Sequence, residues 1–272
     1  MPHKNERQET IMSKIIVITN RKGGTGKSTT AANLGIGLAR QGKRVLIIDA
    51  DSQNSLSISL GVSEPDKLPV TLATVMSNII SETDFNPTDG IIRHAEGIDL
   101  LPANNSLART ELDLASLLVG RDTVLRQYTE MVKTNYDYII ADTAPTLGLL
   151  TVNALAAADN VIIPVTPKYL DAKGLEMLLK TISQIKRQIN PNLAISGILL
   201  TMVEKRANFT REIISLIEGA YGGKIHIFGE HIPRSIRAAE TSAYGKSIYL
   251  HDPKGKAAAA YTALTGEVLA SA

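Results

Sequence analysis

Residues 14–29 read KIIVITNRKGGTGKST, and this stretch decides the fold. Its first part is a continuous apolar run that predicts a buried strand over residues 15–19. The apolar spacing that follows predicts a helix over 28–41, closed by Gly42. A strand, a glycine-rich loop and a helix in this order place backbone N–H groups at a helix N-terminus, where they favour phosphate.

The loop between this strand and helix has the chemistry of a phosphate-binding loop. Gly23, Gly24 and Gly26 let the backbone turn and approach a phosphate without a Cβ clash. Lys27 can reach the terminal phosphates, and the Ser28 hydroxyl can ligate Mg²⁺. The standard pattern G-x-x-x-x-G-K-[ST] nevertheless fails at its first position, where residue 21 is an arginine. The predicted nucleotide contacts are Gly23, Gly24, Thr25, Gly26, Lys27, Ser28 and Thr29.

The rest of the chain alternates short apolar runs with amphipathic stretches. Further strands are predicted at 45–49, 138–142, 161–165 and 195–201, and further helices at 123–134, 149–158, 174–189 and 210–220. Residues 61–105 predict shorter helices and a lesser strand over one sheet edge. Continuous apolar strands separated by helices favour an α/β fold, a mostly parallel twisted sheet with helices on both faces. We expect a disordered extension over 1–13 and one domain over 14–272.

Carboxylates follow two of the predicted strands. Asp49 ends the strand at 45–49 and Asp51 follows it by two residues, while Asp142 ends the strand at 138–142. Ligands of such sheets bind at the carboxyl ends of the strands. These side chains therefore suit Mg²⁺ and water chemistry beside the phosphate loop.

Composition excludes several classes of protein. The chain has 272 residues and no cysteine, which excludes disulfides, thiolate metal sites and thiol nucleophiles. We find no run of eighteen apolar residues and expect no membrane span. Residues 168–256 carry a formal charge of +6 and the remainder −4, although the whole chain is only +2. This asymmetry favours a polyanionic partner such as nucleic acid or an anionic membrane.

The phosphate loop resembles the deviant Walker A motif of the ParA/MinD group of P-loop ATPases. The resemblance implies ATP and Mg²⁺ as ligands and a homodimer that encloses two nucleotides. It implies that Lys22 crosses to the partner's nucleotide and acts with Lys27 on the phosphates. Asp51 would position the attacking water. Ser28, Asp49 and Asp142 would serve the Mg²⁺ site, Asp142 as the Walker B acid.

The same resemblance implies an adenine site and marks one departure. Met202 and Pro233 match positions that border the base in this family. Where the family often has Pro-Gln-Gly-Asn after the second strand, this chain has Ser52-Gln53-Asn54. The conformation of that loop is therefore open, although both carboxylates are retained.

Features that this chain lacks distinguish it from several members of the ParA/MinD group. Members with iron–sulfur clusters need cysteines, and MinD-type members end in a basic amphipathic helix, whereas this tail is alanine-rich. We expect Tyr261, Leu264 and Val268 to pack the tail onto the sheet. The remaining resemblance is to ParA/Soj-type partition ATPases. Thirteen residues before Lys14 are too few for a helix-turn-helix.

This resemblance predicts a cytoplasmic, nucleoid-associated ATPase that binds double-stranded DNA without sequence preference. A ParB-like centromere-binding protein would stimulate hydrolysis, and no membrane partner is expected. The candidate DNA contacts are Lys205, Arg206, Arg211, Arg234, Arg237 and Lys246. Two alternatives stay open: a MinD-like positional ATPase for a membrane or polar assembly, and a nucleotide-gated binding module with negligible hydrolysis.

Overall fold

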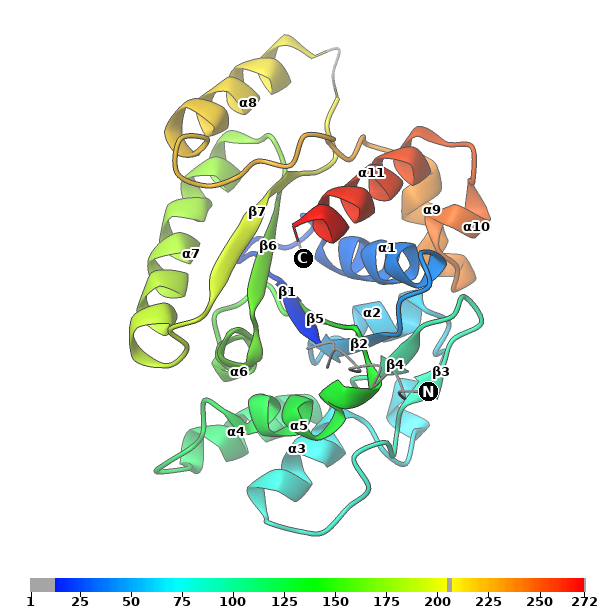
Figure 1. Ribbon diagram of the computed structural model, residues 1–272, viewed down its shortest axis with the longest axis vertical. Helices are drawn as coiled ribbons and strands as arrows, with labels where there is room; N and C mark the ends of the chain where they lie inside the picture. Colours follow the sequence, from blue (N-terminus) through cyan, green and yellow to red (C-terminus); the bar gives the residue numbers. More distant parts are fainter. Residues whose placement is uncertain (1–12, 205–206, 272) are drawn as a thin grey trace, which may run out of the picture.

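A seven-stranded sheet runs through the computed structural model, which describes residues 13–204 and 207–271 (Figure 1). The strand order is β3-β4-β2-β5-β1-β6-β7, and every neighbouring pair is parallel except β3 with β4. The strands are β1 (Lys14–Ile18), β2 (Val45–Ala50), β3 (Ile92–Arg93), β4 (Asp99–Leu101), β5 (Tyr138–Thr143), β6 (Asn160–Val165) and β7 (Ala194–Leu200). The predicted mostly parallel α/β sheet is confirmed. Of the predicted disordered extension, residues 1–12 lie outside the described part.

Helices cover both faces of this sheet (Figure 1). They are α1 (Lys27–Arg40), α2 (Ser55–Ser59), α3 (Leu72–Ile80), α4 (Leu107–Ser116), α5 (Val124–Val132), α6 (Leu149–Ala157), α7 (Tyr169–Gln188), α8 (Asn208–Tyr221), α9 (Ile236–Tyr244), α10 (Ile248–His251) and α11 (Lys256–Ala270), with single 3₁₀ turns at η1 (Pro65–Lys67) and η2 (Lys133–Asn135). The predicted helices are present, and α7 begins five residues earlier than the apolar pattern indicated. Within the described ranges no helix is long and apolar enough to cross a bilayer.

Two apolar cores form because alternate strand residues point to opposite faces. On β1, Ile15 and Val17 belong to the core shared with α3 to α8, whereas Ile16 and Ile18 belong to the core shared with α1, α2, α10 and α11. Every residue of β2 and β5 is buried. Strands covered on both faces need continuous apolar sequence, which is the pattern that predicted them.

Two glycines let α1 pack closely on both sides. A Cβ at Gly35 would lie 2.5 Å from the Cδ1 atom of Ile47 on the sheet. A Cβ at Gly37 would lie 2.3 Å from Thr265 Oγ1 on α11 and 2.7 Å from Tyr249 Oη on α10. The helix that begins at the phosphate loop is therefore clamped between the sheet and the C-terminal helices.

The C-terminal tail shares an apolar core with the sheet, in agreement with its predicted packing. Tyr261, Leu264 and Val268 are buried, as expected. They belong to the same core as Ile18 of β1, Ile162 of β6 and Leu199 of β7, and the helix α11 that carries them also contacts α1 and α10 on this side of the sheet (Figure 1). The alanine-rich sequence explains the contact with α1, because small side chains let two helices approach closely.

The sheet edge at residues 61–105 follows the prediction only in part. Short helices and the strand β4 are present, and β4 extends the parallel sheet beside β2. The additional strand β3 has two residues and pairs antiparallel with β4. A strand this short has no detectable sequence periodicity, so the pattern could not have indicated it.

The register of the central strands brings two acidic residues to the same edge of the sheet. Asp49 of β2 is paired in register with Asp142 of β5, and Asp142 is paired with Ile18 of β1. Parallel neighbours lie about 4.8 Å apart, so both carboxylates end beside the loop that leaves β1.

Candidate functional site

The loop between β1 and α1 forms an open cradle of backbone groups. Gly24 and Gly26 have φ angles of 71° and 83°, which side-chain-bearing residues rarely adopt. In the described structure no side chain caps the N-terminus of α1, whose first hydrogen bond runs from Thr30 N–H to the Gly26 carbonyl at 2.8 Å. A Cβ at Gly23 or Gly24 would meet no described atom within 4 Å. The cradle therefore has room and N–H groups for an anion.

Neighbouring strands hold this loop in shape. The Asn20 side chain accepts a hydrogen bond from Lys22 N–H at 3.0 Å and donates one to the Pro164 carbonyl at 2.6 Å. The Thr201 hydroxyl donates to the Thr25 carbonyl at 2.8 Å. The loop is thus tied to the end of β6 and to the segment that follows β7.

The two loop lysines occupy different environments. Lys27 is only 7% exposed, and its ammonium donates to the Lys22 carbonyl at 3.3 Å. Burial lowers the pKa of Lys27, while the charges of Asp142 and Asp51 act in the opposite direction. The Lys22 side chain is exposed. Lys27 therefore faces the inside of the site, whereas Lys22 is accessible to another molecule.

Asp142 is a fully buried carboxyl group at the end of β5. Neither of its oxygens has a hydrogen-bond partner in the described parts of the chain. Burial, followed by the charge of Asp49, raises its pKa to about 8, and the nearby Ser28 hydroxyl and Lys27 ammonium lower it. A buried, unpartnered carboxylate is costly unless a cation compensates it. The donor set at Asp142 and Ser28 fits a hard cation such as Mg²⁺.

Asp49 is also fully buried, and both of its oxygens already have partners. Oδ2 accepts hydrogen bonds from the Ser57 backbone N–H at 2.8 Å and from the Ser57 hydroxyl at 2.7 Å, while Oδ1 accepts from Asp51 N–H at 3.2 Å. Burial raises the pKa of Asp49 to about 6, and these hydrogen bonds limit the rise. The geometry makes Asp49 an anchor for the loop after β2.

Asp51 lies in that loop, whose shape the sequence left open. Its Oδ1 accepts a hydrogen bond from Gln53 N–H at 2.9 Å, and its carbonyl accepts one from Asn54 N–H at 2.9 Å. Asn54 has a φ of 46°, a left-handed conformation that asparagine tolerates well. The departure from the family sequence is accommodated by this turn, and α2 begins directly after it.

The cation site predicted at Ser28, Asp49 and Asp142 is not a cage of protein ligands. Within the described ranges no three acidic, histidine or cysteine side chains gather closely enough to hold a metal. Mg²⁺ usually takes one or two protein ligands and completes its shell with water and substrate phosphates. The residues present fit that mode of binding.

A pocket of about 270 Å³ lies beside the cradle. It is lined by Gly26, Thr29, Thr201, Met202, Ile232, Pro233, Arg234, Ser235, Ile236, Ala238, Ala239 and Tyr261. Both predicted adenine contacts, Met202 and Pro233, are therefore in its wall. Met202 has a φ of 52°, an uncommon conformation, and its Cε atom would lie 4.0 Å from a Cβ at Gly26 of the phosphate loop. The pocket is mostly apolar and continuous with Gly26, which suits a planar base attached to a phosphate chain.

The candidate DNA contacts are spread over separate elements. Arg211 is exposed on α8, Arg237 lies in the first turn of α9, and Lys246 follows its last turn. Arg234 precedes α9 and lines the pocket. Lys205 and Arg206 lie outside the described residues. The structure thus brings Arg234 and Arg237 together near the pocket and leaves Arg211 on a different helix.

Some site residues carried no signal in the sequence. Ser57 binds Asp49 across eight positions, and no local motif links the two. Tyr261 belongs to α11, lines the base pocket and lies 3.4 Å from the Thr30 hydroxyl. Ser235 caps α9 by accepting a hydrogen bond from Ala238 N–H. A Ser before an apolar stretch is a helix N-cap signal, so α9 was the one feature that closer reading could have found.

The chain is similar to known proteins over nearly its full length. Residues 13–195 match the family model described as AAA domain. The chain is 40% identical to the sporulation initiation inhibitor protein Soj of Bacillus subtilis, with 96% of this chain and 100% of Soj covered. It is 36% identical to the chromosome partitioning protein ParA of Myxococcus xanthus, over 98% of this chain and 91% of that protein.

Among solved structures, the cobyrinic acid a,c-diamide synthase of Mycobacterium smegmatis, crystallised with an ATP analogue and magnesium, superposes with a TM-score of 0.83. Its sequence is 33% identical, and the match covers 94% of each chain. The near-complete coverage of Soj and ParA, together with the phosphate loop and the carboxylates beside it, settles the classification. The chain belongs to the ParA/Soj family of P-loop ATPases.

Proposed function

We propose that this protein is a DNA partition ATPase that binds DNA as an ATP-bound homodimer and releases it after hydrolysis. As a member of the family it is an ATP hydrolase that uses ATP and Mg²⁺. The observation that carries the proposal is the contrast within one loop, where Lys27 is buried toward the site and Lys22 is exposed at its mouth.

Within one subunit, the residues have separable tasks. The backbone N–H groups of residues 23–29 hold the phosphates, and Lys27 neutralises their charge. The pocket bordered by Met202 and Pro233 holds the base. Ser28 and Asp142 would hold Mg²⁺, which when bound offsets negative charge on the phosphate oxygens. Asp49 keeps the loop after β2 in place.

The exposed Lys22 serves the dimer in this proposal. A lysine outside its own site can approach the phosphates of a second subunit that faces it. A second positive charge there offsets the charge that develops during phosphoryl transfer. Closure over two nucleotides therefore depends on ATP and on Lys22.

Hydrolysis itself is assigned to Asp51. Its carboxylate lies next to Asp49 at the carboxyl edge of the sheet and is positioned by Gln53 N–H. From there it would orient the attacking water, with a ParB-like partner accelerating the step. An Asp51→Ala variant should bind ATP and dimerise but lose turnover, and unchanged turnover in that variant would remove Asp51 from the mechanism.

DNA binding is proposed to be independent of sequence. The excess of six positive charges over residues 168–256 favours the phosphate backbone. In cells this binding would place the protein on the nucleoid. Arg211, Arg234, Arg237 and Lys246 remain the described candidates for the contacts.

The test is binding to random-sequence duplex DNA with ATPγS, with ADP and without nucleotide, across a salt series. We expect binding only with ATPγS, weakening steeply as salt rises. Lys22→Ala should abolish the nucleotide-dependent dimer, measured by light scattering, and the DNA binding with it. Arg21→Ala, which removes an exposed cation from the same loop, is the matched control and should retain both.

A different outcome would identify the alternative. If the ATPγS-bound dimer forms and yet binds no DNA at low salt, the partition proposal fails. Binding of that dimer to vesicles containing anionic lipid would then favour the positional ATPase.

A further inference from the structure

Two of the candidate DNA-contacting arginines are already paired with carboxylates of their own chain. Arg234 Nη1 lies 2.5 Å from Glu204 Oε1, and the two side chains are 71% and 50% exposed. The pair spans distant parts of the sequence, because Glu204 follows β7 whereas Arg234 precedes α9. Both residues line a groove of about 700 Å³ beside the base pocket. This arginine reaches solvent with its charge already compensated.

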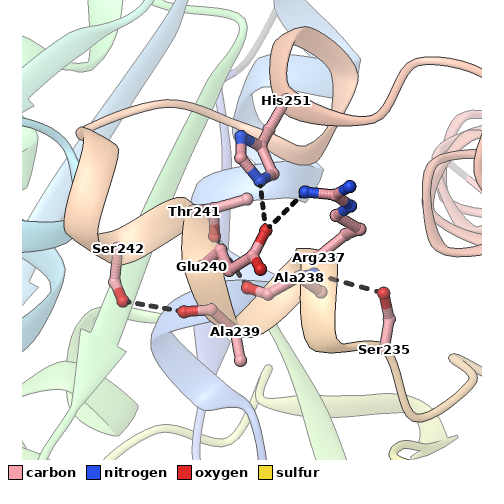
Figure 2. Close-up of polar contacts among 8 residues, drawn as sticks. All are labelled: Ser235, Arg237, Ala238, Ala239, Glu240, Thr241, Ser242 and His251. Carbon is pink, nitrogen blue, oxygen red and sulfur yellow. Dashed lines mark hydrogen bonds and ion pairs between the residues drawn. The ribbon is translucent and has the colours of Figure 1, made fainter.

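Arg237 has the same kind of partner, and Figure 2 shows the arrangement. Its Nη1 lies 3.0 Å from Glu240 Oε2, one turn further along α9, and the side chains are 64% and 36% exposed. The same Oε2 atom lies 2.8 Å from Nε2 of His251 on α10. The His251 ring also stacks on Tyr244, with ring centroids 5.1 Å apart. Glu240 is therefore held by His251 as well as by Arg237.

Such exposed ion pairs contribute little to folding, because water screens them and long side chains lose freedom in forming them. They do change what an approaching polyanion meets. A phosphate that binds a paired arginine must replace a carboxylate, and it also meets the negative charge that remains nearby. The planar guanidinium group of arginine matches the geometry of both carboxylate and phosphate. A DNA phosphate can therefore take the place of the carboxylate on the same arginine.

We propose that Glu204 and Glu240 are resident competitors of the DNA backbone, which occupy Arg234 and Arg237 and thereby hold DNA affinity low enough for release. The inference rests on the proposed DNA binding and adds its regulation. The location supports it, since Arg234 lines the base pocket, and so do Ala238 and Ala239, which lie in α9 between Arg237 and Glu240.

The two pairs differ in what remains after exchange. When Arg237 turns to a phosphate, Glu240 retains His251, whereas Glu204 retains no second partner of that kind in the described contacts. Releasing Arg237 from Glu240 therefore leaves a carboxylate that is still partly compensated by His251. This release costs less free energy than releasing Arg234 from Glu204. We expect neutralisation of Glu204 to have the larger effect on DNA affinity.

The experiment compares Glu204→Gln and Glu240→Gln with the unaltered protein on random duplex DNA at saturating ATPγS. Each variant should bind tighter at low salt, by about 3-fold or more. Its log–log salt dependence should be steeper by up to about 0.9, the value for one additional uncompensated cation at the phosphates. Glu64→Gln is the matched control, since Glu64 forms a similarly exposed pair with Lys67 at 2.6 Å on η1. It should change affinity by less than 2-fold.

Double variants separate competition from general repulsion. If Glu204 acts through Arg234, the gain from Glu204→Gln should fall to the level of the Glu64 control in an Arg234→Gln background. The same applies to Glu240→Gln with Arg237→Gln. Equal gains with and without the arginine, or no gain in either single variant, would overturn the inference while leaving DNA binding intact. No DNA binding by the unaltered ATPγS dimer would overturn both proposals.

Discussion

Replacing Asp142 by asparagine is expected to stabilise the nucleotide-free protein at neutral pH while abolishing Mg²⁺-dependent hydrolysis. The carboxyl group is fully buried, both of its oxygens lack partners in the described residues, and its pKa is raised to about 8. Folding therefore requires this group to be either protonated or charged in an unfavourable environment. Asparagine has a similar shape and carries no charge to bury.

The size of the effect follows from the pKa. A group whose pKa rises from 3.8 unfolded to about 8 folded destabilises the fold as pH rises between these values. Relative to a permanently neutral side chain, linkage gives a cost of about 4 kcal/mol at pH 7 and about 2 kcal/mol at pH 5. The advantage of Asp142→Asn should therefore shrink by about half over that range, because the native carboxyl is mostly protonated at both pH values, whereas the unfolded carboxyl gains less from ionisation as pH falls toward its own pKa of 3.8.

Urea denaturation followed by circular dichroism, at pH 5 and pH 7 with EDTA and no nucleotide, measures this difference. Asp84→Asn, at an exposed position, is the control and should change the free energy of unfolding by less than about 0.5 kcal/mol. A variant that is less stable than the native protein at pH 7, or an advantage that grows toward pH 5, would refute the reasoning.

Two other substitutions test the packing around the site. Ser57→Ala leaves the buried Ala103 N–H without its acceptor and removes a charge-assisted hydrogen bond from Asp49, so urea denaturation should show a loss of about 2–4 kcal/mol. Because the pKa of Asp49 would rise further above about 6, the loss should be larger at pH 8 than at pH 5. Gly37→Ala should lower the free energy of unfolding by about 1–3 kcal/mol, since its Cβ would lie 2.3 Å from a hydroxyl oxygen of α11. In contrast, Gly266→Ala in an open position of α11 should stabilise by up to about 1 kcal/mol, and equal effects at both glycines would contradict the close packing.

The phosphate loop and its strand could be predicted because their signal is local. Glycine spacing, the Lys-Ser pair at residues 27–28 and the apolar run before them are contiguous, and a loop of this kind owes its shape to its own backbone. The structure adds that Asn20 and Thr201 hold the loop from outside. Those contacts connect distant segments, and residue type alone does not indicate them.

The two buried carboxylates show more clearly what a sequence pattern cannot predict. Asp49 and Asp142 are both acids at strand ends, and residue type and position alone do not separate their tasks. In the structure Asp49 is saturated by Ser57 and Asp51 N–H, whereas Asp142 is unpartnered. The difference arises from α2, which places Ser57 over one strand end and not the other.

Sequence by itself determined the fold class, the phosphate loop and the acids beside it, because each depends on short-range periodicity or on backbone requirements of a few adjacent residues. Tertiary structure alone decided that α11 packs on α1, that residues from α9 and α11 complete the base pocket, and that Arg234 and Arg237 are paired with Glu204 and Glu240. Charge counts along the chain record how many cations a segment has. Only the folded positions determine which of them are already compensated, since the energy of a charge depends on its neighbours in space.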